Sequence, residues 1–280
     1  MSDQHPFIQV NHLFYCYPDG TQALDDIQIE IYEGEFIAFI GQNGSGKTTL
    51  SKCLNGLFKP TVGDVIVDGL NSKITPIVQM VRRVGYVFQN PDHQLFNSNC
   101  KDEIAYGPRN IQLPEDQVQE RVEEAARVVG LDEGFFEEHP FFLSKGLRQR
   151  VAIASILALR PKVIIVDEPT TGQDTRQSME IMEFLKSLND KLGHTVIIIT
   201  HDMPIVAKYA RRVIIMGNGR ILADGPTKEI FTLTDILAKT YLEPPQITQL
   251  AQRCVSLGFS PATLTVEEML DQYLRLASPR

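Results

Sequence analysis

The sequence has few cysteines, and their spacing suits neither metal binding nor cross-linking. Its 280 residues include only four, Cys16, Cys53, Cys100 and Cys254, and no two of them form a Cys-x-x-Cys pair. Zinc ribbons and disulfide frameworks both depend on closely spaced or regularly repeated cysteines. The sequence therefore predicts neither a structural zinc site nor a disulfide-stabilised fold.

Long hydrophobic runs are also missing. No apolar run approaches the roughly 18–20 residues that a helix needs to cross a bilayer. The first residues, "MSDQHPFIQV", have neither the positively charged region nor the apolar region of a signal peptide. We therefore expect a cytoplasmic protein that reaches a membrane only through a partner.

Positive charge is scarce relative to negative charge. Lysine and arginine number 27 against 35 aspartates and glutamates, which gives a net charge of -8 at pH 7. Because proteins that grip nucleic acid by its phosphates need basic surfaces, this balance argues against a nucleic-acid partner. The 43% hydrophobic and 22% charged residues are typical of a soluble globular protein.

The apolar pattern changes twice along the chain. Before about residue 90, short alternating runs such as "IQIEIY" and "EFIAFI" predict β-strands. Residues of about 91–159 are charged and helix-forming, with Gly130 as a helix end, and predict an inserted helical subdomain. After two prolines, amphipathic segments and a capping box from Thr265 to Glu268 predict a helical extension over residues 241–280. Residues 1–240 are expected to form the main domain.

Two later runs, "KVIIVDEP" and "HTVIIITHD", are apolar and rich in β-branched residues throughout. Such runs are typical of central parallel strands that are buried on both faces. A helical pattern between them supplies the crossover of a βαβ unit. Together with a hairpin around Gly217–Gly219, they predict an α/β fold with a largely parallel sheet.

One run has the spacing of a phosphate-binding loop. "GQNGSGKT" fits G-x-x-x-x-G-K-[ST], and it lies between an apolar strand and a helical segment. Glycines let backbone N–H groups approach phosphate oxygens, the lysine reaches the β- and γ-phosphates, and Thr48 offers a hydroxyl to Mg²⁺. The predicted nucleotide ligands of this loop are Asn43, Gly44, Ser45, Gly46, Lys47, Thr48 and Thr49.

Acidic residues follow the predicted strand "KVIIVDEP". In an open α/β sheet its carboxyl end lies beside the phosphate loop. Asp167 is expected to hold Mg²⁺ through water, and Glu168 to accept a proton from an attacking water. The alternative is a pair of solvated acids at a strand end. His201 follows the second such strand and is a candidate γ-phosphate contact, although a lone histidine there is more often structural.

In this order the motifs resemble the nucleotide-binding subunit of an ATP-binding cassette (ABC) ATPase, over residues of about 7–235. The resemblance rests on the phosphate loop, "VGYVFQNP", "LSKGLRQR", the strand before Glu168, "TTGQD" and His201. It implies a P-loop, RecA-like ABC core with an antiparallel β subdomain and a helical subdomain. The implied cofactors are ATP and Mg²⁺, and the implied activity is ATP hydrolysis coupled to transport.

The resemblance also implies roles for single residues. Tyr17 would stack on adenine, Gln89 would sense Mg²⁺ and the attacking water, and Asp174 would line a dimer interface. Ser144 and Gly146 would contact ATP bound to a second ATPase chain. Taken alone, Ser144 is better explained as an ordinary N-cap of the helix that follows it, and only the presence of the other motifs favours a nucleotide contact.

One stretch, "QNPDHQLFNSNCKDEIAYGPRN", resembles the ATPases of energy-coupling factor (ECF) transporters, which import vitamins or, in a related group, cobalt or nickel. This resemblance implies a groove of Asp92, Gln94, Leu95 and Phe96 that receives an arginine-bearing coupling helix. The implied partners are a transmembrane energy-coupling subunit and a substrate-specificity membrane subunit. They would hold the chain at the cytoplasmic face of the cell membrane, and residues 241–280 would help to hold a dimer.

Three alternatives stay open: a conventional ABC importer or exporter ATPase, a soluble non-transport ABC ATPase, and a small-molecule P-loop kinase. The sequence does not name the cargo. The loop "LSKGL" also departs from the family's Leu-Ser-Gly-Gly-Gln at Lys145 and Leu147. The lysine could point at the phosphates or outward, and the second ATPase could be a copy of this chain or a sister protein.

Overall fold

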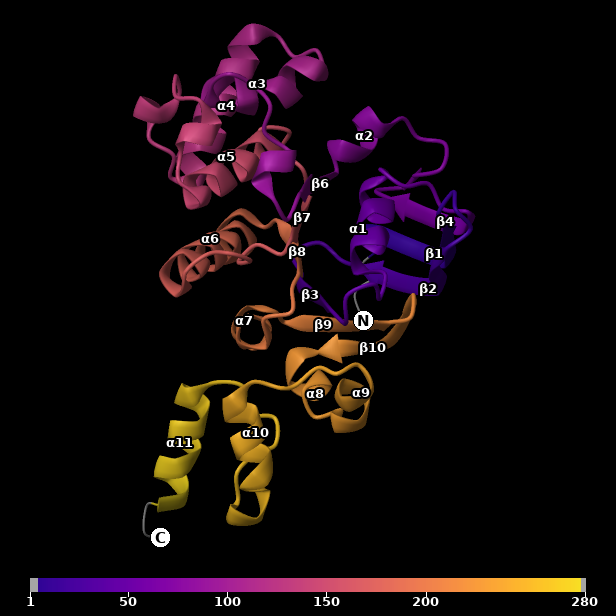
Figure 1. Cartoon of the computed structure of the whole chain (residues 1–280), viewed down its shortest axis with the longest axis vertical. Helices are drawn as coiled ribbons and strands as arrows, with labels where there is room; N and C mark the ends of the chain where they lie inside the picture. Colours follow the sequence, from indigo (N-terminus) through magenta and orange to yellow (C-terminus); the bar gives the residue numbers. More distant parts are fainter. Residues whose placement is uncertain (1–4, 278–280) are drawn as a thin grey trace.

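A six-stranded sheet forms the centre of the structure, a computed structural model that describes residues 5–277. Its strands are β3 (Phe36–Ile40), β6 (Val84–Val87), β7 (Val163–Asp167), β8 (Thr195–Ile199), β9 (Arg212–Gly217) and β10 (Arg220–Pro226). Their order is β10-β9-β3-β8-β7-β6. All pairs are parallel except the β9–β10 hairpin. The predicted α/β fold, βαβ crossover and hairpin are therefore confirmed (Figure 1).

Both faces of this sheet are buried, which explains its apolar strands. In β3, Ala38 and Ile40 belong to one hydrophobic cluster, whereas Ile37 and Phe39 belong to another. Successive side chains of a strand point to opposite faces. A strand between two cores must therefore be apolar at every position.

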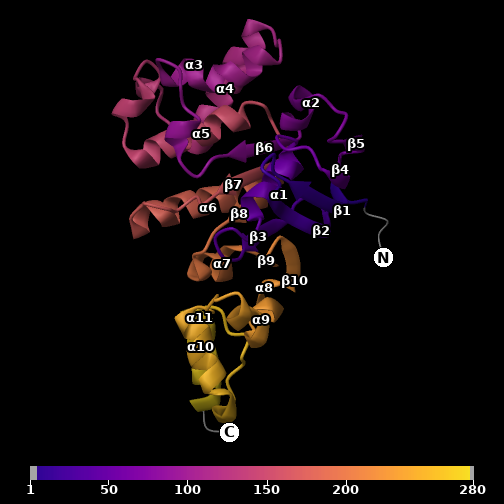
Figure 2. The same cartoon turned by 45° about the vertical axis from the view of Figure 1, so that its right-hand side comes forward.

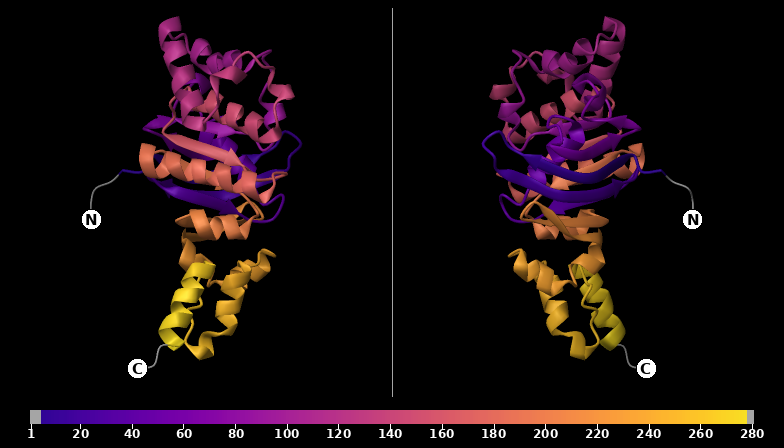
Figure 3. Two further views of the ribbon diagram at one scale, coloured as in Figure 1. Left: turned by 90° about the vertical axis from the view of Figure 1, so that its left-hand side faces the viewer. Right: turned by 90° about the vertical axis from the view of Figure 1, so that its right-hand side faces the viewer.

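A smaller antiparallel sheet lies beyond one face, with α1 between the two sheets (Figures 1 and 3). Leu50 and Leu54 of α1 share a cluster with Ile8 of the small sheet and Ile165 of the central sheet. The small sheet has the order β2-β1-β4-β5. The elements are β1 (Ile8–Cys16), β2 (Gln22–Ile31), α1 (Lys47–Asn55), β4 (Val62–Val67), β5 (Leu70–Asn71) and α2 (Ile77–Val81).

Helices cover the other face and extend to one end of the molecule. A group of three helices stands at that end and is entered after β6 and left before β7 (Figure 2). Its α4 ends as predicted at Gly130, which adopts a left-handed conformation with φ 66°. The three helices of this group are α3 (Cys100–Asn110), α4 (Glu115–Val129) and α5 (Lys145–Leu157), and the group also includes the 3-10 turns η1 (Pro91–His93), η2 (Glu133–Phe135) and η3 (Pro140–Phe142). Two further helices, α6 (Thr175–Leu192) and α7 (Met203–Tyr209), follow later in the chain.

The last helices project from the opposite end, where α10 and α11 lie side by side (Figures 1 and 2). Val266, Leu270 and Tyr273 of α11 are each more than half exposed. At the start of α11, the Glu268 N–H donates to Thr265 Oγ1 at 3.2 Å, so that half of the predicted capping box forms. These elements are α8 (Thr227–Ile230), α9 (Thr234–Lys239), α10 (Gln246–Arg253), η4 (Val255–Leu257) and α11 (Val266–Ala277). Within residues 5–277, no helix has both the length and the hydrophobicity needed to cross a membrane.

Candidate nucleotide site

A cavity of about 360 Å³ lies where α1 begins and β7 ends. Segments far apart in the sequence meet there because the carboxyl ends of parallel strands share one edge of the sheet. Of the residues predicted from the sequence, those lining it are Tyr17, Asn43, Gly44, Gly46, Lys47, Thr48, Thr49, Gln89, Asp167 and Glu168.

Two glycines of the phosphate loop are required by its shape. Gly41 has φ 149° and Gly46 has φ 101°, values that suit glycine best. A Cβ atom on Gly41 would lie 2.2 Å from the Met216 carbonyl oxygen, and one on Gly46 would lie 2.8 Å from the Ala23 carbonyl oxygen. The loop therefore passes tightly into the N-terminus of α1, whose free N–H groups suit an anion such as phosphate.

Lys47 is held inside this loop and is only 8% exposed. Its ammonium donates to the carbonyl oxygens of Gly41 and Gln42, both at 2.8 Å, and to Ser45 Oγ at 3.3 Å. Burial lowers the pKa of Lys47, while the nearby carboxylates of Glu168 and Asp167 act in the opposite direction. Neighbouring negative charge thus favours the cation that a phosphate would need.

Asp167, at the end of β7, accepts two hydrogen bonds at the same oxygen. Its Oδ2 receives one from Thr48 Oγ1 at 3.0 Å and one from the buried Tyr86 hydroxyl at 2.7 Å. Burial, followed by the charge of Asp167, raises the pKa of Tyr86, so that the phenol keeps its proton and donates. Sequence reasoning missed Tyr86. The available signal was a tyrosine in an apolar strand next to the strand that carries Asp167.

These oxygen donors fit Mg²⁺. Thr48, Asp167 and Gln89 border one cavity, and Mg²⁺ in nucleotide sites usually takes one or two carboxylates together with substrate phosphates. Among the described residues, no three histidine, cysteine or acidic side chains gather into a dedicated metal cluster. The chain is thus suited to hold Mg²⁺ together with a nucleotide.

Glu168 is fixed at both carboxylate oxygens. Oε2 accepts from Thr171 Oγ1 at 3.0 Å, and Oε1 lies 3.0 Å from His201 Nδ1. Its backbone has φ 51°, an unfavourable value for a residue with a side chain, and its N–H donates to the Ile199 carbonyl at 2.8 Å. His201 is exposed and contacts Glu168 without lining the cavity, so its predicted phosphate contact stays a prediction.

Tyr17 lies at the mouth of the cavity, within an aromatic group. Its hydroxyl is 2.8 Å from Thr49 Oγ1. Its ring meets those of Tyr15 and Phe58 edge-on, with centroids 5.2 and 5.9 Å apart. These contacts fix the ring of Tyr17 next to the phosphate loop, as a stacking partner for a base requires.

The signature loop, residues 143–147, is not part of this cavity. Ser144 caps α5, its Oγ accepting the Leu147 N–H at 3.4 Å, which is the N-cap alternative. Outside its own helix, a Cβ atom on Gly146 would have no neighbour closer than 3.8 Å. The packing of this chain therefore does not require a glycine there.

Two further side chains near this loop have partners in their own chain. Lys145 is bound within its own chain, because its ammonium donates to the Thr171 carbonyl oxygen at 2.8 Å. Asp174 caps α6, accepting the Gln177 N–H at 2.8 Å. Its predicted place in a dimer interface stays a prediction.

The structure corrects the groove predicted after Gln89. A second cavity, of about 330 Å³, is lined by Gln94 and Phe96 together with residues of α2, α3 and β6. Leu95 is only 3% exposed, because its apolar side chain packs in the same core cluster as Cys100 and Ile104 of α3. Asp92 does not line this cavity, and its Oδ1 lies 2.9 Å from Arg148 Nε.

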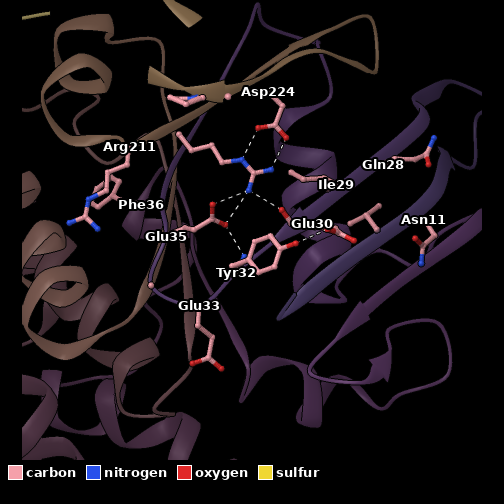
Figure 4. A pocket seen from close by; sticks show the side chains of 15 residues that line it. Asn11, Gln28, Ile29, Glu30, Tyr32, Glu33, Glu35, Phe36, Arg211 and Asp224 are labelled. Atoms are coloured by element: carbon pink, nitrogen blue, oxygen red, sulfur yellow. Dashed lines mark hydrogen bonds and ion pairs between the residues drawn. The ribbon is translucent and has the colours of Figure 1, made fainter. Parts of the chain in front are cut away.

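A larger, open pocket of about 1020 Å³ lies between the β2–β3 turn and the β9–β10 hairpin (Figure 4). Its central cation, Arg212, pairs with Asp224 at 2.6 Å and Glu35 at 3.0 Å, and it donates to the Glu30 carbonyl at 2.9 Å. The hydrogen bonds that the Arg212 guanidinium donates to Asp224 are the main reason why the pKa of Arg212 is raised. Arg212 of the central sheet thus already holds Glu30 of the small sheet, so the pocket is better explained as structural.

Comparison with known proteins decides the family. The model of the ABC transporter family matches residues 24–171, which include the phosphate loop and the strand that ends at Asp167. The chain belongs to the ABC transporter family. The resemblance predicted from the sequence is confirmed.

Similar proteins place the chain near the ECF branch of this family. It is 41% identical over 272 residues to the "energy-coupling factor transporter ATP-binding protein EcfA" of Methanothermobacter thermautotrophicus, covering 96% of this chain and 87% of that protein. The solved structure of cbiO1 from Clostridium perfringens, described as part of the ABC transporter complex cbiONQ, has a TM-score of 0.75 at 38% identity and covers 88% of this chain and 99% of that one. The ADP- and Pi-bound dimer of the ATP-binding cassette MJ0796 has a TM-score of 0.70 at 28% identity, covering 78% and 98%.

Other curated relatives of this ABC family member are much longer. The chain spans 45% of one relative that is 51% identical and 44% of another that is 40% identical, so it covers about half their length. The structures of this chain, of cbiO1 and of the MJ0796 cassette share one α/β architecture, so the predicted ABC fold is confirmed.

Proposed function

We propose that this chain is the ATP-binding and ATP-hydrolysing subunit that energises an ECF-type importer. The observation that carries the proposal is the single cavity in which Lys47, Asp167 and Glu168 lie beside a glycine-rich loop. Phosphoryl transfer to water needs little more than positioning, charge stabilisation and a base. All three are available at this cavity.

Each residue then has a role. Lys47 and the N-terminus of α1 hold the β- and γ-phosphates. Thr48, together with Asp167 through water, would hold Mg²⁺, which would supply positive charge to the phosphate oxygens. Glu168 takes a proton from the attacking water as the water oxygen bonds to the γ-phosphorus and the bond to the β–γ bridging oxygen breaks. Gln89 orients that water, and His201 contacts the γ-phosphate.

A second ATPase chain completes the site, either a copy of this chain or a paralogue. Ser144 is exposed, and Gly146 is half-exposed with no neighbour outside its own helix that would crowd a Cβ atom, which leaves both residues accessible to another molecule. We infer that these two residues face ATP bound to the other chain, with Asp174 at the interface. The ADP- and Pi-bound dimer of the similar cassette MJ0796 supports this arrangement. Residues 1–240 act as the ATPase domain, and the apolar side chains of α10 and α11, in residues 241–280, help to hold the dimer.

The groove lined by Gln94 and Phe96 is the proposed contact with the membrane. Phe96 is 62% exposed and leans edge-on against Tyr106. Asp92 lies four residues earlier in the sequence, where its carboxylate is paired with Arg148 of the same chain. Exposed apolar side chains beside an acid suit an amphipathic helix that bears arginine. The partners are then a transmembrane energy-coupling subunit and a substrate-specificity subunit, which selects a vitamin or a transition-metal ion. The chain would lie on the cytoplasmic face of the cell membrane, without nucleic acid.

Purification of the tagged chain from detergent-solubilised membranes tests this proposal. We expect a small transmembrane protein to copurify with the wild type, and to be lost with Phe96→Asp but not with Phe142→Asp, a control at a still more exposed phenylalanine outside the groove. A soluble complex only would favour a non-transport ABC ATPase. A full set of conventional importer or exporter subunits would favour that alternative.

A further inference from the structure

We propose that Lys145 is a positioning residue that ties the signature loop to the glutamate base of its own chain. The inference rests on the proposed ATPase function and deepens it. We call the ATP site that contains Lys47 and Glu168 of this chain its own site. The ATP site of the other chain, which Ser144 of this chain faces, is the partner site. The family's usual glycine at position 145 has no side chain that could make such a tie.

The position of Lys145 calls for an acceptor. It is the first residue of α5, where the positive end of the helix disfavours a cation. The Thr171 carbonyl oxygen, 2.8 Å from Nζ, supplies the compensating negative end of a dipole. The lysine is only partly exposed, so this contact is partly shielded from water.

The residue that accepts from Lys145 also holds the base. Thr171 donates its hydroxyl to Glu168 Oε2 at 3.0 Å, and its N–H donates to the Glu168 carbonyl at 3.2 Å. One threonine thus links the ammonium to both the side chain and the backbone of Glu168. His201 contacts the other carboxylate oxygen.

The segment after Glu168, residues 169–173, passes close to the lysine. Gly172 follows Thr171 with φ 71°, and a Cβ atom there would lie 2.3 Å from Lys145 Nζ. A larger residue at position 172 would therefore displace the ammonium. The close fit makes the loop and the lysine one packed unit.

This unit joins the two ATP sites. Ser144 and Gly146 flank Lys145, so a nucleotide that moves them in the partner site also moves the lysine. The lysine passes that displacement to Thr171 and hence to Glu168 in the own site. Lys145 therefore acts on hydrolysis in its own site and not on the phosphate of its partner.

Hydrogen exchange on the full-length chain tests the tie itself. With Lys145→Met, the amides of Thr171 and Gln173 should exchange about tenfold faster, as expected for the loss of a hydrogen bond from a charged donor. Lys145→Arg should restore most of the protection. Lys162→Met, at an exposed lysine elsewhere, should change nothing in this loop. Unchanged exchange with Lys145→Met would overturn the tie.

Two mixed dimers, built from differently tagged full-length chains, test its direction. In the first, one chain carries Glu168→Gln and the other Lys145→Met, so the working base lies in the chain without the lysine. In the second, one chain carries both changes and the other is wild type. The working base then lies in the wild-type chain, whose site faces the altered signature loop of the other chain. We expect kcat about tenfold lower in the first dimer, with KM for ATP within about twofold, and no change in the second.

The reference is a dimer of one Glu168→Gln chain and one wild-type chain. A slow second dimer with a normal first one would mean that Lys145 acts on the partner's nucleotide, and equal rates in all dimers would mean that it has no role. Either result overturns the proposal. Absence of hydrolysis by the wild-type dimer would instead overturn the proposed ATPase function.

Discussion

The phosphate loop and the signature loop lie in one chain but differ in how complete they are. At the phosphate loop, Lys47 and Asp167 are nearly buried, and each has several hydrogen-bond partners within the chain. At the signature loop, Ser144 is exposed and Gly146 is half-exposed. The phosphate loop is pre-organised for its ligand, whereas the Ser144 hydroxyl of the signature loop caps its own helix. The difference indicates that a second molecule supplies what the signature loop lacks.

The largest effect on ATP hydrolysis is expected at the site formed by the phosphate loop and Glu168. Glu168→Gln removes the base but keeps an amide oxygen to accept from Thr171, so ATP should still bind while hydrolysis falls by about 10²–10⁴-fold. The measurement is phosphate release together with retained ATP after rapid gel filtration. Glu123→Gln, at an exposed acid of α4, is the control. Hydrolysis at the wild-type rate would remove Glu168 as the base.

A pair of glycine variants should show that the phosphate loop and the signature loop differ in their effect on stability. Gly41→Ala forces a Cβ atom against the Met216 carbonyl at 2.2 Å, so we expect the free energy of unfolding to fall by about 3 kcal/mol and ATP binding to be lost. Gly146→Ala meets no such obstacle, and stability should stay within about 1 kcal/mol while ATPase activity of the dimer falls. Denaturant unfolding and ATPase assays measure both. Equal destabilisation by the two changes would contradict the comparison.

A smaller effect is expected at Tyr86. Tyr86→Phe removes one hydrogen bond to Asp167 and leaves the one from Thr48. Outer-shell partners of metal ligands tune metal affinity by about 10–100-fold, so half-maximal ATPase activity should need about tenfold more Mg²⁺. Tyr32→Phe removes an exposed hydrogen bond to Glu30 and serves as the control. An unchanged Mg²⁺ requirement would show that Tyr86 serves packing alone.

The smallest effect on activity is expected far from both halves. Leu270→Glu places a charge on the exposed apolar side of α11, which should weaken the dimer without unfolding the chain. ATPase activity should fall only at low protein concentration, and sedimentation should show more monomer. If neither changes, α11 does not take part in pairing.

Much of the phosphate-binding half could be predicted because spacing along the chain determines its geometry. The glycine-rich loop, the apolar strands and the acids at their ends are local patterns whose consequences follow from the parallel sheet. Tyr86 could not be assigned, since its hydroxyl reaches Asp167 only through the pairing of β6 with β7. The partner of Lys145 depends on how α5 lies against the loop after Glu168. Leu95 was misplaced because its side chain packs in the core, which depends on tertiary packing and not on a local pattern.

Complementation tests the central claim most directly, namely that the signature loop acts on ATP held by another chain. Gly146→Glu leaves the phosphate loop intact and blocks the signature loop, whereas Glu168→Gln does the reverse. We predict that each variant alone hydrolyses ATP about a hundredfold more slowly than the wild type, and that mixing them restores activity at least about tenfold through one intact composite site. Wild-type activity of the Gly146→Glu chain alone, or no recovery on mixing, would contradict the claim.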